Sequence, residues 1–116
     1  LDCEVKEQTD EATELDYHSQ RLMAPNINSL QQGTSIFLAI RPEDIKVTKK
    51  AAGKSENSLK GIVSEALFSG NIMKISITLL SNDVIKVECQ PKANSFSLGD
   101  DVYVNWLPAD CNVLLN

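Results

Sequence analysis

The sequence predicts an all-β fold, a barrel or a sandwich, built from two similar halves. Apolar and polar residues alternate with a period of two along most of the 116 residues. Helical spacing over a useful length is missing, and turn-forming residues recur at a spacing of about 8–12 residues. This turn spacing predicts about eight strands, and the length fits one domain spanning residues 1–116.

The strands follow one another with few interruptions. LDCEVKE at 1–7 alternates strictly, whereas TSIFLAI at 34–40 is apolar on both faces and is expected to be covered on both sides. MKISITLL at 73–80 and VIKVEC at 84–89 flank the turn SND, which predicts a hairpin. Two more strands are DVYVNW at 101–106 and NVLL at 112–115. NINSLQQG at 26–33 offers one helical turn, and the polar stretch at 48–58 predicts a flexible loop.

The two halves contain a repeated segment. SLQQGTSIFLAIRPEDIKV begins at Ser29 and SFSLGDDVYVNWLPADCNV begins at Ser95, and one constant offset aligns them. The starts of the halves match more weakly, through Val5 with Val63 and Glu7 with Glu65. The repeat predicts a pseudo-symmetric barrel or two half-barrels packed together. Three of its identical positions form a structural turn signature, namely Gly33, Pro42 and Asp44 in the first copy and Gly99, Pro108 and Asp110 in the second.

Each part of this signature has a structural explanation. The glycines offer a position without a Cβ at the turn before a strand. The prolines end the hydrogen bonding of that strand and hold the preceding residue extended. The aspartates are expected to accept backbone N–H groups and so close the turn. The signature therefore predicts architecture rather than chemistry.

Arg41 and Glu43 are not explained in this way. Leu107 replaces Arg41 in the second copy, so the turn itself does not require the arginine. Arg41 beside Glu43 and Asp44 predicts either a local ion pair or a contact with another subunit. We therefore take Arg41 and Glu43 as the candidate subunit contact.

Composition excludes several classes of function. The net charge is −5 and only two arginines are present, which argues against nucleic acid as a partner. Phe96, Tyr103 and Trp106 could form a stacking platform for single-stranded RNA, but they occupy expected core positions and lack basic neighbours. No stretch of about 18 apolar residues is present to cross a membrane.

No catalytic, cofactor-binding or metal-binding residue is predicted. His18 is the single histidine and is expected on an exposed strand, so a multi-histidine metal site is excluded. TKKAAGKS at 48–55 is close to a phosphate loop, but Thr48 replaces the first glycine and no βαβ unit surrounds it. The seven carboxylates between Asp2 and Asp16 are expected to be a solvated strand face rather than a cation site.

The three cysteines, Cys3, Cys89 and Cys111, form no C-x-x-C pair. Cys3 and Cys89 lie on the apolar side of alternating stretches, which predicts small core residues in a reducing compartment. The chain begins without methionine and already in a strand pattern. We therefore expect it to be a fragment of a longer polypeptide.

Three segments together carry a family resemblance: AIRPEDIKV at 39–47, LKGIVSEALFSGNIMKISITL at 59–79 and LGDDVYVNWLPADCNVLL at 98–115. They resemble the C-terminal regulatory domain of the ATP-binding subunits of ABC importers, a transport-associated OB-like (TOBE) domain. The opening VKEQTDE at 5–11 is similar to the spermidine/putrescine branch, and iron, sulfate and sugar importers are similar over the same regions. The resemblance implies an OB-like β domain that follows an ATPase domain in one polypeptide.

The resemblance also implies partners. A second copy of the subunit would form a homodimer, permease subunits would bind the parent ATPase, and a small-molecule regulator or polyamine would be a further ligand. ATP and Mg would belong to the parent chain and no cofactor to this fragment, which cannot hydrolyse ATP alone. The implied location is cytoplasmic, at the inner face of the plasma membrane. Two other hypotheses are a stand-alone small-ligand (oxyanion) module, akin to molybdate-binding proteins, and an RNA-binding OB domain.

Overall fold

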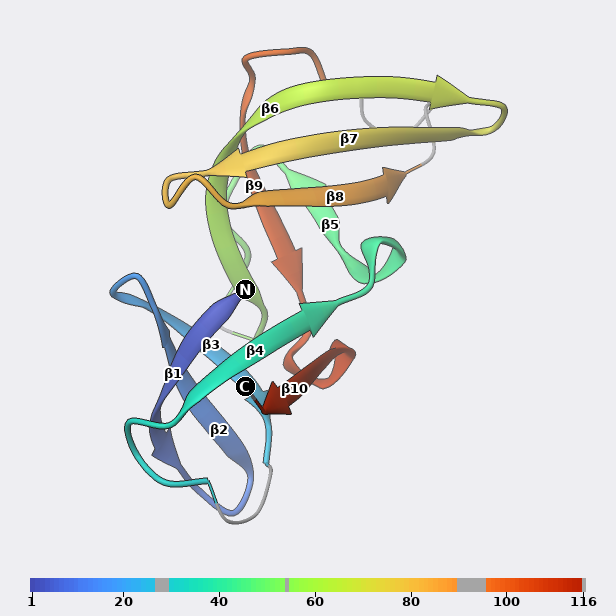
Figure 1. The fold of residues 1–116 in the computed structure, drawn as a ribbon. Coiled ribbons are helices and arrows are strands. Elements are labelled where there is room, and N and C mark those ends of the chain that lie inside the picture. The colour runs from blue at the N-terminus through green and yellow to red at the C-terminus, as the bar shows by residue number, and fades with distance from the viewer. Residues whose placement is uncertain (27–29, 54, 90–95, 116) are drawn as a thin grey trace. The chain divides into compact units, whose positions relative to one another are not determined.

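The structure is a computed structural model that describes residues 1–26, 30–53, 55–89 and 96–115. These residues form ten strands and two short 3-10 helices, and they contain no helix long and apolar enough to cross a membrane. The strands make two five-stranded sheets (Figure 1). Two compact units result: unit 1 comprises Leu1–Arg41 with Leu107–Asn116, and unit 2 comprises Pro42–Trp106. The all-β prediction is confirmed, with ten strands in place of about eight because QRLMAP and KVT also form strands.

Unit 1 is one antiparallel sheet with the strand order β10-β4-β1-β2-β3. Its strands are β1 (Asp2–Gln8), β2 (Ala12–Tyr17), β3 (Gln20–Pro25), β4 (Ser35–Ile40) and β10 (Cys111–Leu115). Burial alternates along β2 and along the first half of β1, as the period of two predicts. β4 departs from its prediction, because Phe37 on its second face is exposed rather than covered. His18 is exposed as expected, but with a φ of 47° it lies in the turn between β2 and β3 instead of in a strand.

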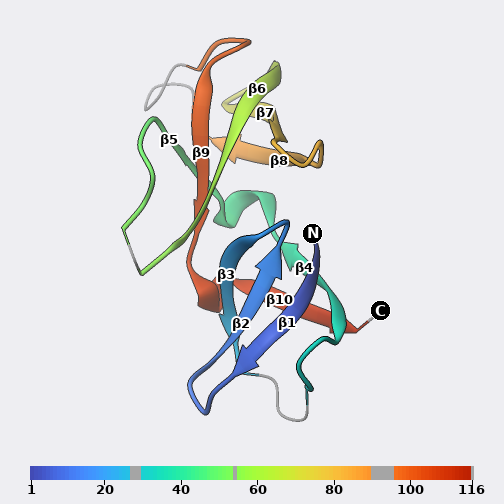
Figure 2. The same cartoon turned by 90° about the vertical axis from the view of Figure 1, so that its left-hand side faces the viewer.

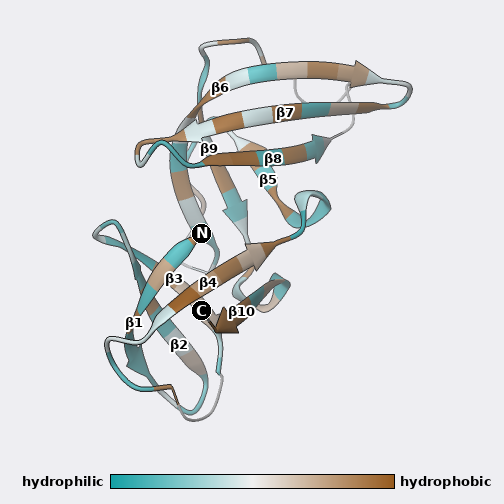
Figure 3. Ribbon diagram, in the orientation of Figure 1, coloured by the Kyte–Doolittle hydropathy of each residue, from teal (hydrophilic) through white to brown (hydrophobic). Residues whose placement is uncertain are grey.

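Unit 2 is a second antiparallel sheet with the order β5-β9-β6-β7-β8. It contains the 3-10 helix η1 (Pro42–Asp44) and the strands β5 (Lys46–Thr48), β6 (Asn57–Ser69), β7 (Ile72–Leu79), β8 (Val84–Cys89) and β9 (Asp101–Trp106). The predicted hairpin is β7–β8, with Asn82 at a φ of 73° in its turn. Figure 3 shows apolar and polar residues alternating along β7. Every second residue of β7 is buried, so one face of the sheet is apolar and packs against the core.

The two sheets have the same plan, but they exchange their last strand. β1 to β4 correspond in order to β6 to β9. β5, which follows β4 in the sequence, joins the sheet of unit 2, and β10, which follows β9, joins the sheet of unit 1. The chain makes these crossings at η1 and at the 3-10 helix η2 (Pro108–Asp110), a path that Figure 2 also shows. The repeated proline turn is therefore the point where each half of the sequence leaves its own unit.

Hydrogen bonds confirm the repeat in detail. The amide of Gly33 donates to the carbonyl of Val5 at 2.7 Å, and the amide of Gly99 donates to the carbonyl of Val63 at 2.8 Å. Both glycines have positive φ, 88° and 87°. The ladder shifts at equivalent places, between Val5 and Glu7 in β1 and between Val63 and Glu65 in β6. Even the weaker sequence match at the start of each half thus marks an equivalent β-bulge.

The predicted role of the two aspartates in these turns is wrong. Main-chain bonds close the turns, from the amide of Ile45 to the carbonyl of Pro42 at 3.4 Å and from the amide of Asp110 to the carbonyl of Leu107 at 2.9 Å. Each aspartate is the last residue of its 3-10 helix, whereas the free N–H groups lie at the start. The prolines act as predicted, since β4 and β9 end two residues before them and Leu107 is extended.

Three further expectations concern loops and cysteines. The segment 48–58 includes the end of β5 and the start of β6, and its flexibility stays a prediction. The helical turn expected at 26–33 falls partly outside the described residues. Cys3 and Cys111 are buried, and Cys89 lies in β8 with its side chain outside the described residues. Burial raises the pKa of the Cys3 thiol to about 11, so Cys3 is a protonated core residue at neutral pH.

Candidate functional site

Arg41 and Glu43, the predicted subunit contact, are both exposed. Arg41 follows β4, and Glu43 lies in η1 at the crossover between the two sheets. Among the described residues the ion pairs lie elsewhere, between Arg21 and Glu14 and between Lys49 and Asp100. The local ion pair expected for Arg41 is therefore not formed, and its role in a subunit contact stays a prediction.

The two units carry a pocket at the same position of the fold. In each unit it lies over the three-stranded meander that follows the β-bulge, β1–β2–β3 or β6–β7–β8, and has a volume of about 230 Å³. The ladder registers relate the lining residues of one pocket to those of the other. Five equivalent pairs line both: Glu7 and Glu65, Thr9 and Leu67, Ala12 and Lys74, Glu14 and Ser76, Met23 and Lys86.

The pocket of unit 1 is acidic. Glu7, Glu11 and Glu14 line it, and the single cation, Arg21, pairs with Glu14 at 2.7 Å between Nε and Oε1. These carboxylates belong to the run predicted as a solvated strand face, and Glu7 and Glu11 are indeed exposed. Among the described residues, no group of three or more His, Cys, Asp or Glu is arranged to hold a metal ion.

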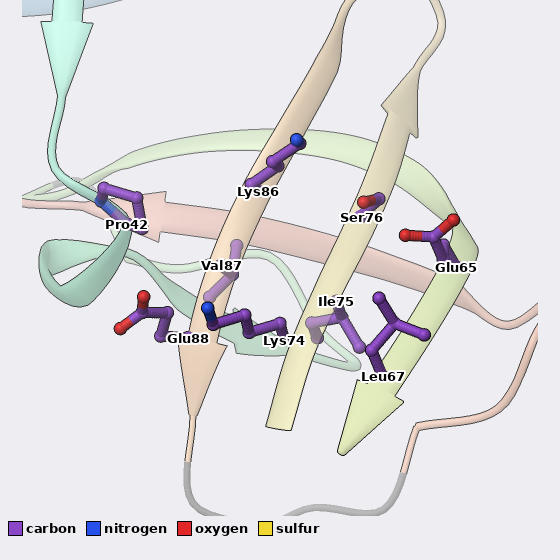
Figure 4. A pocket seen from close by; sticks show the side chains of 9 residues that line it. All are labelled: Pro42, Glu65, Leu67, Lys74, Ile75, Ser76, Lys86, Val87 and Glu88. Carbon is purple, nitrogen blue, oxygen red and sulfur yellow. The ribbon is translucent and has the colours of Figure 1, made fainter. Parts of the chain in front are cut away.

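The pocket of unit 2 has a different charge pattern. Figure 4 shows Lys74 and Ser76 on β7, Lys86 and Glu88 on β8, and Glu65 on β6. The cross-strand rows are Glu65, Ser76 and Lys86, then Leu67, Lys74 and Glu88, so cations and anions alternate across the surface. Neither lysine is within 4 Å of a carboxylate in the described residues. No sequence pattern pointed to this pocket, because single lysines on alternating strands are ordinary surface residues.

A polar network around the buried side chain of Asn105 holds the loop between β5 and β6. The side-chain amide of Asn105 donates to the hydroxyl of Thr48 at 2.8 Å and to the carbonyl of Lys46 at 3.4 Å. The hydroxyl of Ser58 donates to Asn105 and accepts the amide of Ala52 at 3.3 Å. Unit 1 has Ala39 at the position of Asn105, so this network exists in one unit only.

A second set of polar interactions joins the loop between β5 and β6 to the turn before β9. The Asp100 carboxylate accepts the amide of Ser97 at 2.9 Å and lies 3.3 Å from the Lys49 ammonium. These interactions hold the pKa of Asp100 below its ordinary value, and the hydrogen bond from the Ser97 amide contributes most. The ammonium of Lys49 also lies 5.6 Å from the centre of the Phe96 ring. Phe96 and Trp106 are buried as expected, whereas Tyr103 is half-buried, so the two buried rings are not exposed for base stacking.

The rejected phosphate-loop match at 48–55 is followed by the strand β6 rather than by a helix. No helix N-terminus is therefore offered there to a phosphate. Each unit thus presents its own charged sheet face over an equivalent meander, and the two faces differ in charge.

Comparison with known proteins defines the class. The model of the TOBE domain family matches residues 38–114, and this chain belongs to that family. Its fold is OB-like, as the resemblance implied: it is similar to the cytoplasmic molybdate-binding protein ModG with molybdate bound, at a TM-score of 0.83 and 14% identity, over 99% of this chain and 94% of that one. At that identity the likeness to ModG concerns the fold alone.

Sequence relatives are more specific. The chain is 30% identical over 84 residues to the spermidine/putrescine import ATP-binding protein PotA of Trichodesmium erythraeum, covering 71% of this chain and 22% of the relative. It is 28% identical over 94 residues to PotA of Legionella pneumophila, covering 76% of this chain and 26% of the relative. The chain thus spans about a quarter of the length of the curated relatives that it matches.

Proposed function

We propose that this chain is the C-terminal regulatory and dimerisation domain of the ATP-binding subunit of an ABC importer. The observation that carries the proposal is the TOBE family match over residues 38–114, together with import ATP-binding proteins as sequence relatives. The surface is consistent with this role, since both pockets are open sheet faces lined by ordinary charged side chains. In this proposal ATP and Mg are bound by the parent chain, and this domain contributes contacts rather than chemistry.

The proposed solute is spermidine or putrescine. The relatives named above are spermidine/putrescine importers, which supports the polyamine over iron, sulfate or sugar. The proposed partners are a second copy of the subunit, the permease subunits and a small-molecule regulator, at the cytoplasmic face of the plasma membrane. Spermidine itself is expected to bind the acidic face of the isolated domain weakly or not at all, because exposed carboxylates in water attract a flexible polycation only weakly.

A chimera tests the proposal. The region of Legionella pneumophila PotA that matches this chain would be replaced by residues 1–116, and spermidine uptake would be measured in cells that lack their own importer. We expect uptake well above that of PotA truncated before this region, with ATP hydrolysis by the purified subunit retained in both. A chimera that folds and hydrolyses ATP but transports no better than the truncated subunit would contradict the proposal. Reading the parent gene is a second test, since a phosphate loop is expected about 200 residues upstream.

One observation favours a second candidate, a small-oxyanion module. Lys74, Lys86 and Ser76 line the unit 2 pocket, and neither lysine pairs with a carboxylate there. Glu65 and Glu88 line the same pocket and offset the positive charge, so the importer domain is the better supported function. Calorimetric titration with molybdate and sulfate separates the two: saturable micromolar binding that is lost on Lys74→Ala would favour the oxyanion module.

A further inference from the structure

The hairpin β6–β7 is longer than its equivalent in unit 1. Thr9 and Ala12 close the β1–β2 turn with only two residues between them. Leu67 and Lys74 are the equivalent pair, and six residues separate them. The ladder continues past this pair to Ser69 opposite Ile72, so unit 2 has gained a further stretch of two-stranded ribbon (Figure 1).

This extension is apolar where the equivalent turn is polar. Leu67 is 55% exposed, Phe68 71% and Ile72 41%. In unit 1 the same tip carries Asp10 and Glu11, which suit water. Because Leu67 and Phe68 are adjacent in a strand, they point to opposite faces of the ribbon. Each face of the extension therefore carries an apolar side chain that is more than half exposed.

The extension also presents a free strand edge. β6 pairs with β9 from Asn57 to Ile62, and Val63 makes its last bonds to that side. The amide of Val63 donates to the carbonyl of Asp100 at 3.0 Å, and its carbonyl accepts the amide of Gly99 at 2.8 Å. Beyond that point, the described residues supply a ladder partner to Ser64–Ser69 from β7 alone. A free edge with apolar residues, no proline and one charge is a template for pairing with another strand.

We propose that this edge is a self-association surface, on which β6 of one copy pairs antiparallel with β6 of a second copy. The edge is self-complementary about a two-fold axis through Leu67. That register places Leu67 opposite its own counterpart and Phe68 opposite the small Ala66, on matching faces of the joined sheet. Glu65 then lies opposite Ser69, whereas a two-fold axis through Glu65 would bring two like charges together.

The size of this surface indicates how strongly two copies would associate. Six residues of strand edge and three apolar side chains bury far less than the roughly 800 Å² per partner of a standard stable interface. We therefore expect weak pairing of the isolated chain, strengthened when a larger interface in the parent protein raises the effective concentration. In that respect the inference rests on the proposed function and names the surface of the homodimer.

Disulfide trapping tests the register. In a pair of antiparallel strands, directly opposite Cβ atoms lie about 4.5–5.5 Å apart, close to the reach of a disulfide. Leu67→Cys should thus yield covalent dimers on mild oxidation at millimolar chain concentration. The matched control is Leu80→Cys, which is 70% exposed and follows the opposite end of β7. The unsubstituted chain, with Cys3 and Cys111 buried, reports the background.

We expect at least tenfold more covalent dimer from Leu67→Cys than from Leu80→Cys. Adding Phe68→Ser to Leu67→Cys should lower the dimer yield by a similar factor. Equal yields, or no dimer from Leu67→Cys, would overturn the proposed surface. Trapping should also occur within the chimera described above. Two outcomes would mean that only the proposed self-association surface is wrong. In the first, the chimera transports spermidine although Leu67→Cys traps no dimer; in the second, the tip of the β6–β7 hairpin contacts the permease instead of a second copy. If the dimer is trapped and transport fails, the importer function is wrong.

Discussion

Units 1 and 2 share their backbone plan down to single hydrogen bonds, yet their surfaces have diverged. The β-bulge, the positive-φ glycine before the fourth strand and the proline crossover recur in both. The charge differs between the units. Unit 1 has eight acidic and three basic side chains, and unit 2 has eight of each, so the whole net charge of −5 belongs to unit 1. Backbone geometry constrains the buried and turn positions, whereas solvent-facing positions are free to acquire separate binding roles.

Gly61 gives the largest expected difference between the units. An added Cβ would lie 2.6 Å from Ile77 Cγ2 and 2.9 Å from the carbonyl oxygen of Thr78, while Cys3 at the equivalent place in β1 already has a side chain. Gly61→Ala should therefore lower the free energy of unfolding by about 3 kcal/mol. Urea denaturation measures this, with Gly53→Ala as control because nothing lies within 4 Å of its added Cβ. Equal stability of the two variants would mean that β6 and β7 can separate at this point.

Asn105 tests whether the asymmetric network matters. Asn105→Ala gives unit 2 the residue type that unit 1 has at Ala39, but it leaves the half-buried hydroxyl of Ser58 without its acceptor. We expect a loss of about 2 kcal/mol and faster hydrogen exchange at Ala52, which Ser58 anchors. Asn112→Ala on the exposed face of β10 should change stability by less than about 0.5 kcal/mol. Unchanged exchange at Ala52 would show that the loop does not depend on this network.

Gly33 and Gly99 test the equivalence directly. Both have a φ near +88°, where a Cβ is strained, so each substitution to alanine should cost about 1 kcal/mol. The losses should be equal and should add in the double variant, because the two turns are separate. Thermal and urea unfolding of the three variants measure this. A loss at one glycine only would show that the repeated hydrogen bonds differ in strength.

Asp100 gives the smallest effect, through pH. Its pKa is held low in the folded state, so the ionised carboxylate stabilises the fold above its ordinary pKa, and this contribution is lost as the pH falls through the lowered folded value. Unit 1 has Thr34 at this position and no such dependence. Asp100→Asn should therefore be less stable than the parent at pH 7, with the gap narrowing below about pH 4. A gap that is the same at pH 7 and pH 3, measured by urea midpoints, would exclude the carboxylate as its source.

Sequence patterns predicted much of the framework correctly. The period of two located most strands, and the single offset between the halves identified the turn glycines and the crossover prolines. They predicted Asp44 and Asp110 wrongly, because residue type does not reveal at which end of a 3-10 turn a carboxylate lies. They also missed the pocket of unit 2, since Lys74 and Lys86 lie on different strands and come to line one pocket only through the register of β7 with β8.

The all-β class, the duplication and the positive-φ turns follow from the amino-acid sequence alone, because alternation, repetition and glycine conformation are local properties of the chain. Two features emerge from the folded chain instead: β5 and β10 exchange sheets, and the extended β6 edge stays without a ladder partner on the β9 side beyond Val63 in the described residues. Both depend on which distant strand satisfies the hydrogen bonds of an edge. Strands of the same alternating pattern are interchangeable partners until packing selects one.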